Sequence, residues 1–219
     1  MGNLFNMDNK FFQAISKVVD CIWLSILWVL FSIPIFTVGV STTAMYYTVH
    51  KTIKNNRGYI WATFWTAFKA NFKTSTLNWL LQLLLGIIFC MDIRLCYEFM
   101  KGGSIWGYMI FLFLILLVCD LMWAVYCAVY AARFEQDRKT LRKNAGIIAI
   151  INLPWTLLMT VIMIVSILVC IIIPYALLFF PVLTVLMLYV IFEKIFKKYM
   201  SPEDLAWEAE EYRDEGAHR

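Results

Sequence analysis

Hydrophobic residues fall into long blocks that short charged segments separate. The longest block, residues 144–192, runs for 49 residues without an Asp, Glu, Lys or Arg. At about 1.5 Å of rise per residue, that block is roughly 74 Å of helix, enough to cross a hydrocarbon core of about 30 Å twice. The pattern therefore predicts a polytopic helical membrane protein.

Five membrane spans follow from this pattern. We place them at residues 18–38, 77–91, 105–132, 148–171 and 178–196. The last two are separated by a turn near residues 173–178, because Pro174 and Pro181 are the strong helix breakers there. A signal peptide is the rival interpretation of the first block, which is too long and too aromatic for one.

Two further segments are expected to be helical without forming a separate span. Residues 41–55 have a helical pattern but carry His50, Lys51 and Lys54, which favours an interfacial or buried position. Four aromatic residues then recur at steps of four, three and four, so they share one helical face: Trp61, Trp65, Phe68 and Phe72. This stripe predicts an interfacial helix that runs into the second span, although an ordinary packed helix has equal weight.

The expected fold class is therefore all-α, with about five transmembrane helices, an interfacial aromatic helix and a short acidic C-terminal tail helix. Residues 1–200 form one transmembrane domain in this interpretation, and residues 201–219 form a cytoplasmic acidic tail. A short polar loop with Asp92, Arg94, Glu98 and the Gly102–Gly103 pair is expected after the second span.

Composition narrows the function classes. Hydrophobic residues make up 62% of the 219 residues and charged residues only 16%, against about 25% charged in a soluble domain. A soluble enzyme, a disordered chain and a secreted disulfide scaffold are excluded. The six cysteines lie mostly in apolar blocks without a C-x-x-C pair, and His50 and His218 are far apart in polar surroundings. We expect no metal, no cofactor and no enzymatic activity, since the familiar catalytic motifs are also missing.

The distribution of Lys and Arg predicts the orientation in the membrane. With five spans, one face receives five basic residues from segment 51–73, five from 133–143 and five from 194–219, out of 19 in the chain. The positive-inside rule makes this face cytoplasmic, with the N-terminus outside and the C-terminus inside. Anionic lipid headgroups are sufficient partners for these basic segments, so nucleic-acid binding is not expected.

Asp120 is the candidate functional group inside the membrane. It lies 13 residues before Arg133, near the middle of the third predicted span. A carboxylate there is costly, so Asp120 is expected to be protonated, paired or next to a wet cavity. One hypothesis makes it a relay for a proton or solute. The favoured hypothesis makes it a neutral packing residue that hydrogen-bonds Asn78, Gln82, Asn152 or a backbone carbonyl.

A family resemblance adds to this interpretation. The segment Pro34-Ile35-Phe36-Thr37-Val38-Gly39 and the Phe-rich basic helix with Phe68, Lys69 and Phe72 resemble the YesL-like family of bacterial integral membrane proteins, over about residues 15–80. That family is a domain-of-unknown-function family. The resemblance implies a protein of the bacterial cytoplasmic membrane, often encoded beside sugar ABC transporters and glycan-degrading enzymes. It carries over no catalytic residues.

The expected function is thus a non-enzymatic accessory or assembly partner of a carbohydrate uptake system, with ABC-transporter permease subunits as partners. A small-solute or proton-coupled carrier centred on Asp120 is the alternative. A carrier of five spans normally needs an internal repeat or a dimer, and no repeat is visible in the sequence. This favours the accessory role.

Overall fold

The computed structural model describes residues 10–55, 58–134 and 136–200, which are helical and contain no strand. The elements in chain order are α1 (Lys10–Ser32), the 3-10 helix η1 (Ile35–Thr37), α2 (Val38–Thr48), the π-helix η2 (Val49–Lys54), α3 (Ile60–Lys101), the 3-10 helix η3 (Ile105–Met109), α4 (Ile110–Arg133), α5 (Arg138–Ile151), α6 (Leu153–Ile172), the 3-10 helix η4 (Pro174–Leu178) and α7 (Phe180–Tyr199). The predicted all-α class is confirmed. The predicted tail helix and His218 lie outside the described residues.

Four helical segments of the described chain are long and apolar enough to cross a membrane: Ile15–Ser32, Ile60–Lys101, Ile105–Arg133 and Leu153–Ile172. The protein is therefore a multi-pass helical membrane protein. The fifth predicted span, residues 178–196, forms α7, but its last turns carry Glu193, Lys194 and Lys197. Because of these charges α7 is not among the four, and its crossing of the membrane stays a prediction.

Proline positions explain where helices end. α1 stops at Ser32, two residues before Pro34, so the first predicted span is shorter than expected. The predicted turn at residues 173–178 is confirmed as η4, which begins at Pro174. The prediction of one continuous helix for the fourth span, residues 148–171, is wrong. Helix α5 ends at Ile151, and α6 starts at Leu153 with Pro154 in its first turn. A proline lacks the amide hydrogen that would continue the helix.

The predicted polar loop after the second span is also wrong. Residues 92–101 continue α3, and the turn is confined to Gly102, Gly103 and Ser104, with Gly103 at a φ of 74°. Lys101 and Glu98 lie on one helical face 3.6 Å apart, so charged residues in this segment are compatible with a helix. At the closed end of this hairpin, Gly107 packs so closely that a Cβ atom there would lie 2.5 Å from Cα of Met100.

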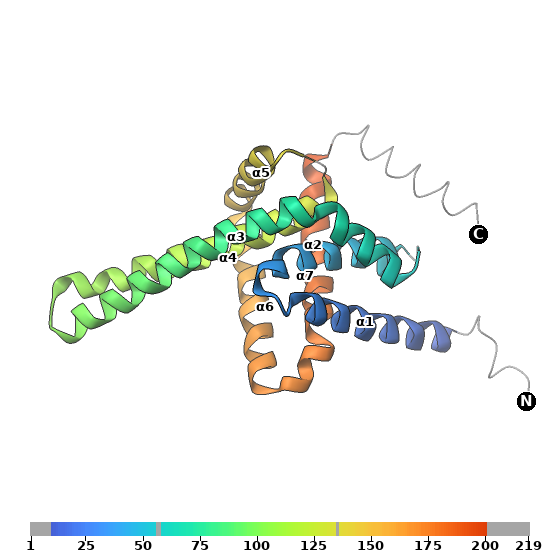
Figure 1. The fold of residues 1–219 in the computed structure, drawn as a ribbon, viewed down its shortest axis with the longest axis horizontal. Helices are drawn as coiled ribbons and strands as arrows, with labels where there is room; N and C mark the ends of the chain where they lie inside the picture. Colours follow the sequence, from blue (N-terminus) through green and yellow to red (C-terminus); the bar gives the residue numbers. More distant parts are fainter. Residues whose placement is uncertain (1–9, 56–57, 135, 201–219) are drawn as a thin grey trace, which may run out of the picture.

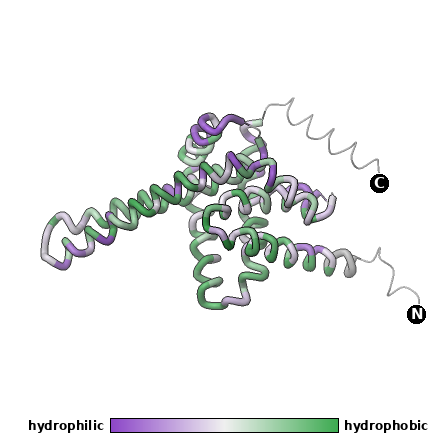
Figure 2. The backbone as a smooth tube through the Cα atoms, viewed as in Figure 1, coloured by the Kyte–Doolittle hydropathy of each residue, from purple (hydrophilic) through white to green (hydrophobic). Residues whose placement is uncertain are grey.

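Two helical hairpins extend from a common centre in different directions (Figure 1). The longer hairpin consists of α3 and α4, and we call its outer part, residues 83–119, the arm. Within the arm, Cys96 and Gly107 are the only buried residues. Figure 2 shows that the arm is largely hydrophobic, with hydrophilic residues toward its tip. The shorter hairpin consists of α6 and α7.

The centre is built around α2, most of whose residues are buried. Residues 41–54 lie in α2 and η2 and most of them are buried, which confirms the helix and favours the buried alternative of the prediction. The aromatic stripe lies at the start of α3, where the ring of Phe31 contacts Trp61, Trp65 and Phe68 at centroid distances of 6.2, 5.5 and 5.1 Å. Trp61 and Phe72 keep exposed faces. The stripe is thus part of a packed helix, and its position along a membrane surface stays a prediction.

Candidate functional site

A line of polar side chains runs along the contact between α3 and α4. Asn78, Gln82 and Gly86 follow one another at steps of four on α3, and Asp120 lies opposite Gly86 on α4. A Cβ atom at Gly86 would lie 3.6 Å from Oδ2 of Asp120. The exposed fractions are 4% for Asn78, 2% for Gln82 and 6% for Asp120. The three polar side chains singled out from the sequence inside these spans are therefore buried.

Each of these side chains has a buried atom without a hydrogen-bond partner: Nδ2 of Asn78, Oε1 of Gln82 and Oδ1 of Asp120. The expected hydrogen bonds from Asp120 to Asn78, Gln82 or Asn152 are therefore not formed within the described residues. Nδ2 of Asn152 donates to the Ile148 carbonyl at 2.9 Å and to the Tyr199 hydroxyl at 3.2 Å, at the break between α5 and α6. Asn152 belongs to that junction.

Two cavities border this polar line. One has a volume of about 470 Å³ and is lined by Gln82, Gly86, Arg94 and Asp120 among others, so the structure does bring Gln82 and Asp120 to one site. The other has a volume of about 520 Å³ and is bordered by helices from both hairpins together with α1 and α2. We call it the central cavity. Gln82 and Trp79 line both.

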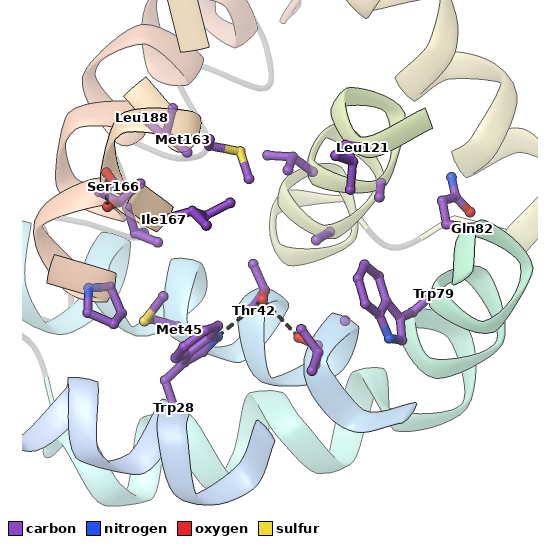
Figure 3. A pocket seen from close by; sticks show the side chains of 18 of the residues that line it. Trp28, Thr42, Met45, Trp79, Gln82, Leu121, Met163, Ser166, Ile167 and Leu188 are labelled. Carbon is purple, nitrogen blue, oxygen red and sulfur yellow. Dashed lines mark hydrogen bonds between the residues drawn. The ribbon is translucent and has the colours of Figure 1, made fainter. Parts of the chain in front are cut away.

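Figure 3 shows the central cavity, with Trp79 and Gln82 on one side and Met163, Ser166 and Ile167 on the other. Asn78 lines it as well. None of its lining residues is an Asp, Glu, Lys or Arg. The walls are predominantly apolar, as in most small-molecule sites.

A second buried cluster joins α2, η2, α4 and α7, and the sequence did not predict it. Nε of Arg133 lies 3.2 Å from Oε1 of Glu193, and its Nη1 lies 2.6 Å from Nε2 of His50. Nδ1 of His50 lies 3.1 Å from the Tyr189 hydroxyl. The Tyr46 hydroxyl donates to Oε1 of Glu193 at 3.3 Å. We call these five residues the ionic cluster.

Burial keeps the Tyr46 phenol of this cluster protonated. Desolvation raises the pKa of the Tyr46 phenol well above its usual range, and the nearby charge of Glu193 raises it further. Tyr46 therefore stays neutral and keeps its hydrogen for Glu193. His50 lies in polar surroundings as predicted, but these are buried side chains, and only 6% of its surface is exposed. The ionic cluster ties together three parts of the chain that are remote in sequence.

The sequence carried one signal for the ionic cluster. Arg133 and Glu193 each stand at the end of a long apolar run, where a charge is either at the membrane surface or paired. The sequence alone favours the surface for both residues, because Lys or Arg residues follow each of them. No group of three or more His, Cys, Asp or Glu side chains within the described residues could hold a metal ion.

The residues of the family motif make a tight turn between α1, α2 and α3. The Thr37 hydroxyl lies 2.6 Å from the Phe31 carbonyl and 2.7 Å from the Pro34 carbonyl, so it satisfies the end of α1. At Gly39, a Cβ atom would lie 2.4 Å from Cβ of Trp79. Pro34, Thr37 and Gly39 therefore have structural roles here, and Phe68 and Phe72 belong to the packed stripe. Lys69 lies over the Trp65 ring at 4.8 Å.

A family model described as "Protein of unknown function, DUF624" matches residues 21–93. The match supports a domain-of-unknown-function family for this part of the chain. It contains the Pro34–Gly39 turn, the aromatic stripe, Asn78 and Gln82, whereas Asp120, Arg133 and Glu193 lie beyond it. The comparisons with curated proteins and with solved structures gave no match.

Proposed function

We propose that this protein is a non-enzymatic accessory or assembly partner of a transport system in the bacterial cytoplasmic membrane. The observation that carries the proposal is the arm. Its α3 part, residues 83–101, is roughly 28 Å long at 1.5 Å per residue, with its charged residues Asp92, Arg94, Glu98 and Lys101 in the outer half, and its α4 part, residues 105–119, has no charged residue. Both of its helices expose large apolar side chains, such as Ile88 and Leu95 on α3 and Phe111 and Ile115 on α4.

Helices in a bilayer associate by close packing of their surfaces. A hairpin whose apolar side chains its own chain leaves uncovered offers two adjacent helices to the helices of another membrane protein. The carbohydrate part of the proposal is supported by the resemblance of residues 15–80 to the YesL-like family, which implies permease subunits of an ABC-type importer as the partner.

Photo-crosslinking in growing cells tests this proposal. A crosslinking amino acid at Ile88 or Phe111 of the arm is compared with one at Val161, which is also well exposed but lies on α6. We expect adducts with a permease subunit from the two arm positions and none from Val161. We also expect slower uptake of the transported carbohydrate in cells that lack the protein. Normal uptake, together with arm adducts that contain only lipid, would contradict the proposal.

A second candidate is a small-solute carrier, favoured by one observation. Asp120 and Gln82 line the cavity of about 470 Å³ together with Arg94, so an ionisable group does face an open volume. A carrier would need Asp120 for transport but not for folding, which separates the two candidates experimentally.

A further inference from the structure

The central cavity has a lining that specifies the chemistry of an occupant. Its volume of about 520 Å³ lies within the range of about 300–1,000 Å³ that is usual for small-molecule sites. It has no charged residue in its walls. A charge buried there would have no counter-charge, so the buried part of an occupant must be uncharged.

Most polar side chains of the wall already have partners. Nε1 of Trp28 donates to the Thr42 hydroxyl at 3.2 Å, and that hydroxyl donates to the Val38 carbonyl at 2.8 Å. The Thr184 and Ser166 hydroxyls lie 2.8 Å apart. These groups have little capacity left for a ligand.

Two more polar residues of the wall also make hydrogen bonds within the protein. Nε1 of Trp79 donates to the Ile35 carbonyl at 2.8 Å, and the Ser75 hydroxyl accepts from Thr43 at 3.1 Å. A sugar would bring many hydroxyl groups that need partners, and this wall cannot supply them.

Asn78 and Gln82 differ from the other polar wall residues, because each has a hydrogen-bonding atom without a partner. Nδ2 of Asn78 is a buried donor without a partner, and Oε1 of Gln82 is a buried acceptor without a partner. The two residues are one helical turn apart on α3, so their side chains are neighbours on one face. A purely apolar occupant would leave both atoms unsatisfied, which is costly in a buried site.

We propose that the central cavity binds an uncharged long-chain lipid with a terminal hydroxyl group. The hydroxyl accepts from Nδ2 of Asn78 and donates to Oε1 of Gln82, and the hydrocarbon chain lies against apolar side chains of α4, α6 and α7, such as Leu121, Met163 and Leu188. One hydroxyl can serve both of these buried atoms, as an acceptor for the first and a donor for the second. This inference does not depend on the proposed accessory function.

A single water molecule would also satisfy the two atoms but would fill only about 30 Å³. The rest of the cavity is walled by apolar side chains and is unfavourable for water, because a buried water needs several polar partners. A hydrocarbon chain fills this volume with favourable contacts, so the alcohol explains both the two polar atoms and the apolar remainder.

The test uses the full-length protein in phosphatidylcholine vesicles and hexadecan-1-ol with a photoreactive diazirine near the end of its chain. We expect saturable labelling of α4, α6 and α7. Unlabelled hexadecan-1-ol should compete, whereas 1-methoxyhexadecane, which cannot donate, and hexadecane should compete about fivefold to tenfold less well. Equal competition by hexadecane would overturn the proposal, because it would show a slot for any acyl chain.

Two variants and a matched control complete the experiment. N78L and Q82L should each weaken labelling about fivefold to tenfold, since each removes one hydrogen-bonding group. N71L removes an amide from the same helix outside the cavity, where Nδ2 of Asn71 donates to the Ala67 carbonyl at 3.1 Å, and should leave labelling unchanged. Wild-type labelling in both N78L and Q82L would overturn the proposal. If either variant fails to fold, the competition series on the wild-type protein decides alone.

Discussion

Nη1 of Arg133 lies 2.6 Å from Nε2 of His50. A guanidinium nitrogen only donates, so Nε2 of His50 is the acceptor and the hydrogen of the neutral ring is on Nδ1. That nitrogen faces the Tyr189 hydroxyl at 3.1 Å and Oε1 of Glu193 at 3.6 Å. His50 therefore orients Arg133 toward Glu193 without adding a charge of its own.

Replacing Glu193 by Gln should destabilise the protein by about 3 kcal/mol, because it removes the carboxylate that contacts the buried Arg133 guanidinium. Thermal unfolding of the purified protein in mild detergent measures this loss. The double variant Glu193→Gln with Arg133→Met should regain part of it, since no buried charge then lacks its counter-charge. Simple addition of the two single losses would show that the two side chains are not coupled.

Gly39 and Gly86 make a matched pair for testing helix approach. Gly39→Ala should cost about 1–3 kcal/mol, because its Cβ atom would overlap with Cβ of Trp79. Gly86→Ala should be tolerated, since its Cβ atom would be in ordinary contact with Asp120 at 3.6 Å. Membrane abundance and thermal unfolding of both variants check the difference. Equal effects would mean that α2 and α3 can separate without loss.

The predicted topology is testable with fused reporters. Reporters after Lys143 and after Arg219 should both be cytoplasmic, and one at Gly102 should be external, because the basic segments gather on one face in the five-span interpretation. Reporter activity on each side of the membrane measures this. A cytoplasmic reporter at Gly102 would reject the span count, and α7 would be the first span to reconsider.

The aromatic stripe should matter more for assembly than its neighbouring lysines. Trp65→Ser with Phe68→Ser removes the rings that pack on Phe31, at a cost of several kcal/mol, on the order of a Phe→Ala change in a core. Lys69→Gln with Lys73→Gln removes one cation–π contact, worth about 0.5–1 kcal/mol. The membrane abundance of the two double variants compares the contribution of the packed rings with that of the lysine side chains. Greater harm from the lysine changes would show that headgroup electrostatics dominates this segment.

Asp120 separates the accessory protein from the carrier. Oδ1 of Asp120 has no hydrogen-bond partner, so Asp120→Leu should leave stability unchanged or raise it by about 1 kcal/mol, and Asp120→Asn should be silent. In the accessory role both variants keep full uptake activity. Variants that are abundant in the membrane yet inactive in uptake would support the carrier. This expectation differs from the packing hypothesis, in which Leu would have stranded polar partners.

The pattern of apolar blocks was sufficient for the fold class, because helix length and hydropathy are local properties of the sequence. Pro174 also marked its turn, since proline acts on the backbone next to it. Pro34 has the same effect after α1, but the predicted first span ran past it to residue 38. Pro154 divides the predicted fourth span by the same effect. The sequence did not indicate this helix end, because the residues on both sides of it are apolar. The charged residues from Asp92 onward suggested a loop, but charged residues do not by themselves end a helix, and α3 continues to Lys101.

The site was predictable only in part, for a physical reason. Asn78, Gln82 and Asp120 stand out because each is a polar residue inside an apolar run. His50, Arg133 and Glu193 lie in segments separated by 83 and 60 residues, and no spacing rule connects residues at that distance. Their contacts depend on how α2, α4 and α7 pack, which is a property of the tertiary structure.

The unbroken length of α3 gives the molecule a mechanical property. The Ser75 hydroxyl contacts Thr43 on α2, and from there the helix runs 26 residues further to Lys101, roughly 39 Å at 1.5 Å per residue. A helix without a proline or a bulge bends little, so it acts as a lever with its fulcrum at α2. A rotation of about 5° there would displace the tip at Gly102 by roughly 3 Å. Force applied at the tip is thus delivered to α2, the helix that carries Tyr46 of the ionic cluster.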